Sequence, residues 1–182
     1  KKFVRLADDN LRRITLGRLS DLAIGRDQSP YELEFSLTGA SYQDIYVIDL
    51  KTGGRKLALK KNRWSFGLSP DTRYLLYYQD GHFFSYELAT GQSYNLTAGL
   101  PASFADEDVD YNVKLLPDIP FGWSKDSRYV LLYDGWDVWQ VEARGRQGLN
   151  LTGNGVKDQI RYQRRFILDP EEKGIDLSQP QY

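Results

Sequence analysis

The stretch from Leu68 to Thr97 constrains the fold more than any other, because the chain repeats its turn residues further on. Ser69-Pro70-Asp71, Asp80-Gly81 and Ala89-Thr90-Gly91 carry turn chemistry, and runs of apolar and aromatic residues lie between them. Strands joined by such tight turns form an antiparallel meander. The sequence therefore predicts a small sheet built from consecutive strands.

A second copy of this pattern runs from Trp123 to Thr152. The matched segments are Ser69-Pro70-Asp71 with Ser124-Lys125-Asp126, Arg73–Tyr78 with Arg128–Tyr133, Asp80-Gly81 with Asp134-Gly135, and Asn95-Leu96-Thr97 with Asn150-Leu151-Thr152. Anchors that recur in the same order indicate an array of like units. A β-sandwich also uses many short strands, but it does not predict the same turn residues in the same order.

Units of four strands with an apolar second strand are typical of β-propeller blades, in which neighbours cover both faces of each sheet. We therefore predict an all-β fold, a partial β-propeller with about three four-stranded antiparallel blades and fractions of a blade at each end. Such a set does not close a ring, and together with the absence of methionine this leads us to expect an internal piece of a longer protein.

The expected single domain, residues 1–182, divides as follows. Residues 1–9 form the last strand of a preceding blade, 10–61 a blade with an insertion at 27–42, 62–97 a blade, 98–118 a crossing loop, 119–152 a blade, and 153–182 the start of the next blade. Within the insertion, Tyr31 to Leu37 alternates apolar and polar residues and predicts an extra hairpin. Strand parity places both long insertions, 27–42 and 98–118, at the same end of the blades, where binding loops usually lie.

Composition excludes several classes of function. The 24 basic and 25 acidic side chains are interspersed, which argues against nucleic acid as a partner. The chain has no cysteine and no apolar run long enough for a membrane span, and it shows no signal peptide. We expect no metal and no cofactor.

Four segments carry a resemblance to a known family: SPYELEFSLTGASYQDIYVIDLKTG, LSPDTRYLLYYQDGHFFSYELATG, FGWSKDSRYVLLYDGWDVWQV and IRYQRRFILDPEEKGID. They resemble the amino-terminal propeller of bacterial prolyl oligopeptidase family serine peptidases of the dipeptidyl-peptidase-like kind, over nearly the whole chain. The turn with aspartate before an aromatic strand also occurs in other bacterial propellers, including the TolB type. The resemblance implies a partner α/β-hydrolase domain in the same protein, a peptide substrate, and a periplasmic or secreted location.

The catalytic parts of such a peptidase are not expected in this chain. A nucleophile elbow needs Gly-x-Ser-x-Gly, and the segments that begin at Gly67 and Gly122 both lack the second glycine. The only histidine, His82, follows Asp80-Gly81 and is interpreted as an exposed turn residue. We therefore predict no catalytic residue here.

Candidate contacts to a substrate or partner lie in the insertions and after the last full blade. They are Tyr31, Glu32, Asp106, Glu107, Asp108, Asp110, Arg161 and Arg164. The alternating acidic residues resemble a calcium loop, but Tyr111 replaces the required glycine and Pro117 the required glutamate, which excludes an EF-hand. A solvated acidic loop, an acidic rim that meets a substrate amine, and pairing of the arginines with this loop remain the alternatives.

Two functions follow. In the first, the chain is the non-catalytic propeller portion of a secreted or periplasmic prolyl oligopeptidase-like peptidase and gates the access of short peptides to a hydrolase domain. In the second, it is a stand-alone protein- or ligand-binding propeller of the TolB type without enzymatic activity. In either case the open ends of the array are expected to favour self-association.

Overall fold

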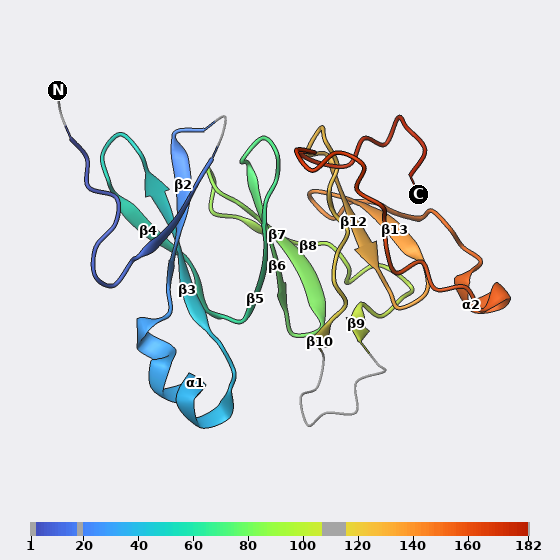
Figure 1. The fold of residues 1–182 in the computed structure, drawn as a ribbon, viewed down its shortest axis with the longest axis horizontal. Helices are drawn as coiled ribbons and strands as arrows, with labels where there is room; N and C mark the ends of the chain where they lie inside the picture. The colour runs from blue at the N-terminus through green and yellow to red at the C-terminus, as the bar shows by residue number, and fades with distance from the viewer. Residues whose placement is uncertain (1–2, 18–19, 107–115, 182) are drawn as a thin grey trace.

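The computed structural model describes residues 3–17, 20–106 and 116–181, and its backbone is nearly all β. Three four-stranded antiparallel sheets stand side by side along the chain (Figure 1). In each sheet the strands follow one another in sequence order, so each is a meander. These sheets are the blades of a partial β-propeller, as the repeat predicted.

The first blade contains β1 (Arg13–Leu16), β2 (Leu22–Asp27), β3 (Gln43–Asp49) and β4 (Arg55–Asn62). The second contains β5 (Trp64–Leu68), β6 (Tyr74–Gln79), β7 (His82–Glu87) and β8 (Ser93–Asn95). The third contains β11 (Gly122–Trp123), β12 (Tyr129–Tyr133), β13 (Val138–Glu142) and β14 (Gly148–Asn150). A short pair, β9 (Ala105–Asp106) and β10 (Leu116–Pro117), lies between the second and third blades in sequence, and α2 (Gly155–Asp158) follows the third.

The insertion in the first blade corrects one prediction. Instead of a hairpin over Tyr31 to Leu37, the structure has the 3-10 turn η1 (Ser29–Tyr31) and the helix α1 (Glu32–Thr38). Pro30 lies in the first turn of η1, and Gly39 ends α1 at φ 72° while its N–H bonds the Phe35 carbonyl at 2.8 Å. Proline is favoured in the first turn of a helix, and a glycine in the left-handed conformation commonly ends one. Pro30 and Gly39 therefore mark the start and the end of this helical segment.

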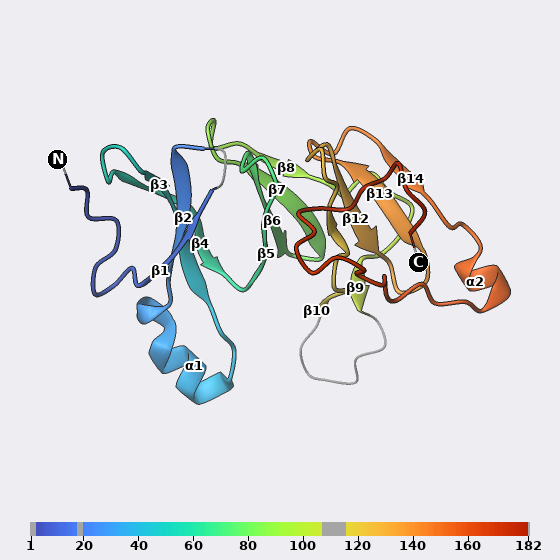
Figure 2. The ribbon, with the colours of Figure 1, turned by 45° about the horizontal axis from the view of Figure 1, so that its top comes forward.

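The two ends of the blades differ, as strand parity predicted. Helix α1 and the β9–β10 pair lie at the same end in Figures 1 and 2, which we call the loop end. The opposite end, the turn end, carries the short connections around Asp71, Gly91 and Asp126.

The repeated turn residues make equivalent hydrogen bonds in the second and third blades. The Ser69 hydroxyl donates to Asp71 at 2.7 Å and accepts the Tyr74 N–H at 3.0 Å, and the Ser124 hydroxyl makes the equivalent bonds to Asp126 and Tyr129 at 2.6 and 3.0 Å. These side-chain bonds close the turn without help from other elements.

The Asn-Leu-Thr segments are likewise structural. The Asn95 carboxamide oxygen accepts the N–H groups of Thr97 and Ala98 at 3.0 and 2.9 Å. In the third blade the Asn150 oxygen accepts those of Thr152 and Gly153 at 3.1 and 2.8 Å. Both segments are therefore turns held by an asparagine side chain.

The cores lie between the blades. Residues such as Leu76, Phe83 and Val130 form one cluster between the second and third blades, and Ile24, Val47 and Leu75 belong to another between the first and second. The facing surfaces of neighbouring blades therefore cover each other, which is the main stabilising term for a blade.

Polar contacts join the second and third blades at the turn end. The Asp71 N–H donates to the Ser127 hydroxyl at 3.0 Å, and Arg144 donates to Glu87 at 2.9 Å. Ser85 also donates to the Ala143 carbonyl.

The two ends of the chain contain no strand of a further blade within the part that the structure describes. Residues 3–7 and 166–171, predicted to belong to neighbouring blades, have no strand assignment. Ile175 instead makes a parallel bridge with Ser124 at the start of the third blade. The division of the chain into blade ranges otherwise stays a prediction.

Candidate functional site

Tyr31 and Glu32, two of the predicted contact residues, lie at the base of α1. The Tyr31 hydroxyl donates to Asp44 at 2.6 Å, and the same Asp44 oxygen accepts the Lys61 N–H at 2.8 Å. Burial, together with this bond to a carboxylate, raises the pKa of Tyr31 to about 12. Tyr31 therefore fastens α1 to the first blade, while Glu32 is exposed.

Two other predicted residues, Asp106 and Arg161, line one cavity at the loop end. This loop-end cavity has a volume of about 560 Å³ and lies beside β9 and the connection from β12 to β13. Its lining also includes Ser103, Asp118, Tyr133, Asp134, Trp136 and Gln163. Glu107, Asp108 and Asp110 lie outside the described residues. Arg164 lines a different cavity of about 380 Å³, beside Leu131 and Leu177.

The walls of the loop-end cavity are held by bonds from the third blade. The Asp134 carboxylate accepts the N–H groups of Trp136 and Asp137 at 2.9 and 2.6 Å and the Trp139 indole N–H at 2.7 Å. The Arg161 guanidinium lies 4.6 Å from the centre of the Trp136 ring, a cation–π distance. The arrangement presents both signs of charge and an aromatic face to one hollow.

Tyr133 shows the electrostatic character of this hollow. Burial raises the pKa of the Tyr133 hydroxyl, and the negative charge of Asp118 raises it further, while the positive charge of Arg161 lowers it. Tyr133 therefore stays a neutral hydrogen-bonding group at ordinary pH.

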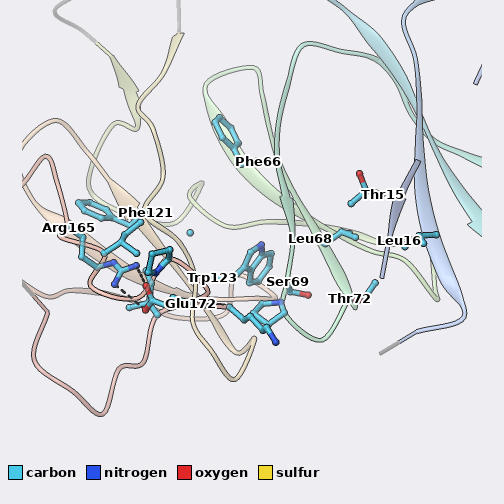
Figure 3. A pocket seen from close by; sticks show the side chains of 17 residues that line it. Thr15, Leu16, Phe66, Leu68, Ser69, Thr72, Phe121, Trp123, Arg165 and Glu172 are labelled. Atoms are coloured by element: carbon cyan, nitrogen blue, oxygen red, sulfur yellow. Dashed lines mark hydrogen bonds and ion pairs between the residues drawn. The ribbon is translucent and has the colours of Figure 1, made fainter. Parts of the chain in front are cut away.

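A second cavity, which we call the inner-edge cavity, has a volume of about 540 Å³ and was not predicted (Figure 3). The first strands of all three blades approach it, through Leu16, Phe66 and Trp123, and the carboxyl-terminal segment forms another wall. There Arg165 binds Glu172 through two bonds of 3.1 and 2.5 Å. The sequence analysis considered pairing of the nearby arginines with the acidic loop and did not predict this ion pair.

The sequence analysis did not predict the inner-edge cavity, because its lining residues come from several segments that lie far apart in the sequence. The available signal was the presence of aromatic residues, Phe66 and Trp123, on strands that open a blade. Trp123 is only 5% exposed, and its ring stacks on Tyr74 with centres 5.9 Å apart.

The serine and histidine side chains that a hydrolase would need have structural contacts. His82 begins β7, is half-buried rather than exposed, and its Nδ1 lies 3.1 Å from the Thr97 hydroxyl. Ser69 and Ser124 are buried in their turns. Among the described residues no group of three His, Asp or Glu side chains has the geometry of a metal site, and no helix is long and apolar enough to cross a membrane.

No protein-family model matches this chain, and no curated protein sequence matches it. Solved structures are similar to it at low identity. They include a putative TolB from Agrobacterium tumefaciens (TM-score 0.42, 22% identity, 72% of this chain and 42% of that one) and TolB from Acinetobacter baumannii (0.42, 17%, 72% and 29%). An oligogalacturonate lyase in complex with manganese is a third (0.40, 14%, 71% and 36%). The chain thus spans less than half the length of each of these proteins.

Proposed function

We propose that this chain is the non-catalytic propeller portion of a secreted or periplasmic serine peptidase similar to the prolyl oligopeptidase family. In this role the loop end of the blades receives short peptides on their way to an α/β-hydrolase domain of the same protein. The observation that carries the proposal is the loop-end cavity, with Asp106, Asp118 and Arg161 in its walls.

The size and charge of this cavity suit part of a short peptide. About 560 Å³ falls within the range of small-molecule sites, which is roughly 300–1,000 Å³. Carboxylates attract the ammonium group of a free amino terminus, and a guanidinium attracts a carbonyl or carboxylate oxygen. A hollow that presents both groups favours a zwitterionic ligand over one of a single sign.

A non-catalytic role is supported by the bonds of the serine turns. The Ser69 and Ser124 hydroxyls each donate to a carboxylate and accept a backbone N–H, so neither is presented as a nucleophile. We expect no turnover of proline-containing chromogenic peptides or of esters by this chain. Turnover that a serine-directed covalent inhibitor abolishes would contradict this expectation.

A stand-alone ligand-binding propeller of the TolB type is the second candidate. The loop-end cavity suits this role as well, because its volume and its charged lining fit a small ligand without a second domain. The two candidates differ in the gene sequence that follows Tyr182. Further blades followed by Gly-x-Ser-x-Gly, aspartate and histidine support the peptidase, and a stop codon soon after ring closure supports the binding propeller.

Peptide binding tests the loop-end site directly. Tripeptides with a free amino terminus should bind, and acetylation of that terminus should weaken binding about tenfold, the loss of one charged contact. Asp118→Asn should weaken binding of the free peptide and have little effect on the acetylated one. Asp80→Asn, a change at an exposed turn residue outside this cavity, is the matched control. Equal binding of free and acetylated peptides would argue against the site.

A further inference from the structure

The first strand of the third blade, β11, has one edge without a partner strand in its sheet. The sheet order is β11-β12-β13-β14, so β11 pairs only with β12. The Ser124 N–H points toward that neighbour and bonds the Tyr129 carbonyl at 2.9 Å. Because backbone groups alternate in direction along an extended chain, the Trp123 carbonyl and the Lys125 N–H face the open edge. Such an edge is a template for another extended segment.

The chain's own carboxyl-terminal segment occupies this edge. The Lys125 N–H donates to the Ile175 carbonyl at 2.8 Å, and the Ile175 N–H donates to the Trp123 carbonyl at 2.9 Å. Together they form a parallel bridge between Ser124 and Ile175. This is the hydrogen-bonding mode of strand addition, in which the main chain supplies affinity and side chains supply selectivity.

Three consecutive residues, Gly174, Ile175 and Asp176, fit the edge in different ways. Gly174 has φ 131°, and a Cβ there would lie 2.9 Å from the Lys125 Cα and from the Pro70 Cγ. Ile175 is 2% exposed, and Asp176 pairs with the Lys125 ammonium at 3.3 Å. The edge therefore excludes a side chain at the first position, buries an apolar one at the second, and places an acidic one beside an exposed lysine at the third.

The residues a few positions before this contact pair with no strand. Phe166, Ile167 and Leu168 are mostly exposed and belong to no strand. Gly174–Asp176 is thus a local anchor on an otherwise irregular segment.

The second blade lacks this edge although its turn is the same. Pro70 stands where the third blade has Lys125, and proline has no backbone N–H to donate. The Ser69 N–H still bonds the Tyr74 carbonyl at 2.8 Å, as Ser124 does with Tyr129. The second and third blades therefore have the same turn, but only the third has an N–H that can bind a segment at this edge.

We propose that the inner edge of β11 is a docking site for an extended polypeptide segment of the pattern Gly-apolar-acidic. Gly174–Asp176 occupies it within the chain, and the same segment of a second copy of this chain takes its place when that anchor is released. This site is separate from the loop-end cavity and does not depend on the proposed function.

The test uses a labelled peptide with the sequence of residues 172–178, Glu-Lys-Gly-Ile-Asp-Leu-Ser, and variants of the whole chain. Gly174→Val should empty the edge, because valine meets the Lys125 and Pro70 atoms and strains at positive φ. We expect the peptide to bind this variant at least tenfold more tightly than the unaltered chain, in which the anchor competes. A scrambled peptide should not bind.

Lys125→Pro, added to Gly174→Val, removes the N–H that the peptide needs and also the ammonium that pairs with Asp176. Lys125→Ala, which keeps the N–H and loses only the ammonium, is the matched control, and the loss beyond that of Lys125→Ala measures the backbone bond. The turn tolerates proline, because Ser69-Pro70-Asp71 already has it in the second blade, and the Tyr129 amide, which bonds Ser124, reports that the turn is intact. Binding should fall about tenfold, as expected for a lost backbone hydrogen bond. The proposal is overturned if the Gly174→Val chain does not bind the peptide, if the unaltered chain binds it equally well, or if Lys125→Pro weakens binding no more than Lys125→Ala does.

Discussion

The second and third blades share their turns but differ in what covers their faces. In β6 of the second blade, all five residues Tyr74–Tyr78 are buried, because the first and third blades cover both sides. The third blade packs on the second through Val130 and Leu132. Its other face, which includes Leu131, meets the carboxyl-terminal segment across a cavity of about 380 Å³.

This difference shows that turn residues and strand residues of the repeat act in different ways. The turn residues determine where each strand begins and ends, and they act through local bonds that are nearly the same in both blades. The contribution of a strand residue to the free energy of unfolding depends instead on the side chains packed against it. Residues at equivalent positions of the two blades therefore need not contribute equally to stability.

The largest effect should come from truncating equivalent leucines. Leu76 and Leu131 occupy the same place in the repeat, and both are buried, at 0% and 4% exposure. Leu76→Ala should lower the free energy of unfolding by about 3 kcal/mol, whereas Leu131→Ala, beside an existing cavity, should cost roughly half as much. Urea unfolding of both variants measures the difference. Equal losses would show that the segment after the third blade covers Leu131 as tightly as a blade would.

A second test compares Glu87 with its equivalent in the third blade, Glu142. Glu87 is 4% exposed and accepts bonds from Arg144 at 2.9 Å and from Arg73 at 3.2 Å, while Glu142 is half-buried. Glu87→Gln should destabilise the chain by about 2 kcal/mol, since it removes a charged partner of two arginines. Glu142→Gln, the matched control, should change thermal stability less.

The pH dependence of this effect has a defined direction. Burial would raise the pKa of Glu87, but the hydrogen bonds from Arg144, Thr90, Arg73 and Tyr94 outweigh it and lower the pKa to about 2. Because the folded-state pKa lies below the ordinary value of 4.5, the carboxylate stabilises the fold above about pH 4.5. That contribution is lost as the pH falls from 4.5 toward 2. Melting curves should therefore show the unaltered chain and Glu87→Gln converging over this window, and a constant difference would contradict the assigned role.

The smallest effect, and the most equal one, is expected at the Asn-Leu-Thr turns. Asn95→Ala and Asn150→Ala each remove an acceptor for two N–H groups and should each cost about 1 kcal/mol. Replacement by aspartate keeps the acceptor and should cost less. Clearly unequal losses for the two alanine variants would mean that the blades differ in their turns as well as in their faces.

The blade pattern could be predicted because its determinants are local. Ser69, Asp71 and Asn95 bond to backbone groups only a few residues away, so their recurrence in the sequence carries the structure directly. The helix α1 could not be predicted in the same way. Leu33, Phe35 and Leu37 alternate with polar residues as in a strand, yet all three are exposed in the structure. Alternation predicts a strand only where one face is buried.

The candidate sites depend on contacts between distant segments, which a single sequence does not reveal. Asp106 and Arg161 were both predicted as contact residues, and pairing of the arginines with the acidic loop was one alternative, but nothing in their spacing shows that they line one cavity. The bridge between Ser124 and Ile175 joins residues of different segments through main-chain atoms, which leave no side-chain pattern. Only Gly174, required by its close approach to Lys125, leaves a trace in the sequence.

The polar contacts between the second and third blades give this part of the fold an uneven mechanical stiffness. Hydrogen bonds from Asp71 to Ser127, from Arg144 to Glu87 and from Ser85 to Ala143 join the blades at or toward the turn end. Toward the loop end the two blades meet through ring contacts, in which Phe104 lies 6.4 Å from Phe83 and 6.2 Å from Trp139. Ring contacts tolerate sliding better than hydrogen bonds do, since dispersion is not directional. Thermal motion should then change the distance between the two blades least at the turn end, which acts as a hinge, and most at the loop-end cavity.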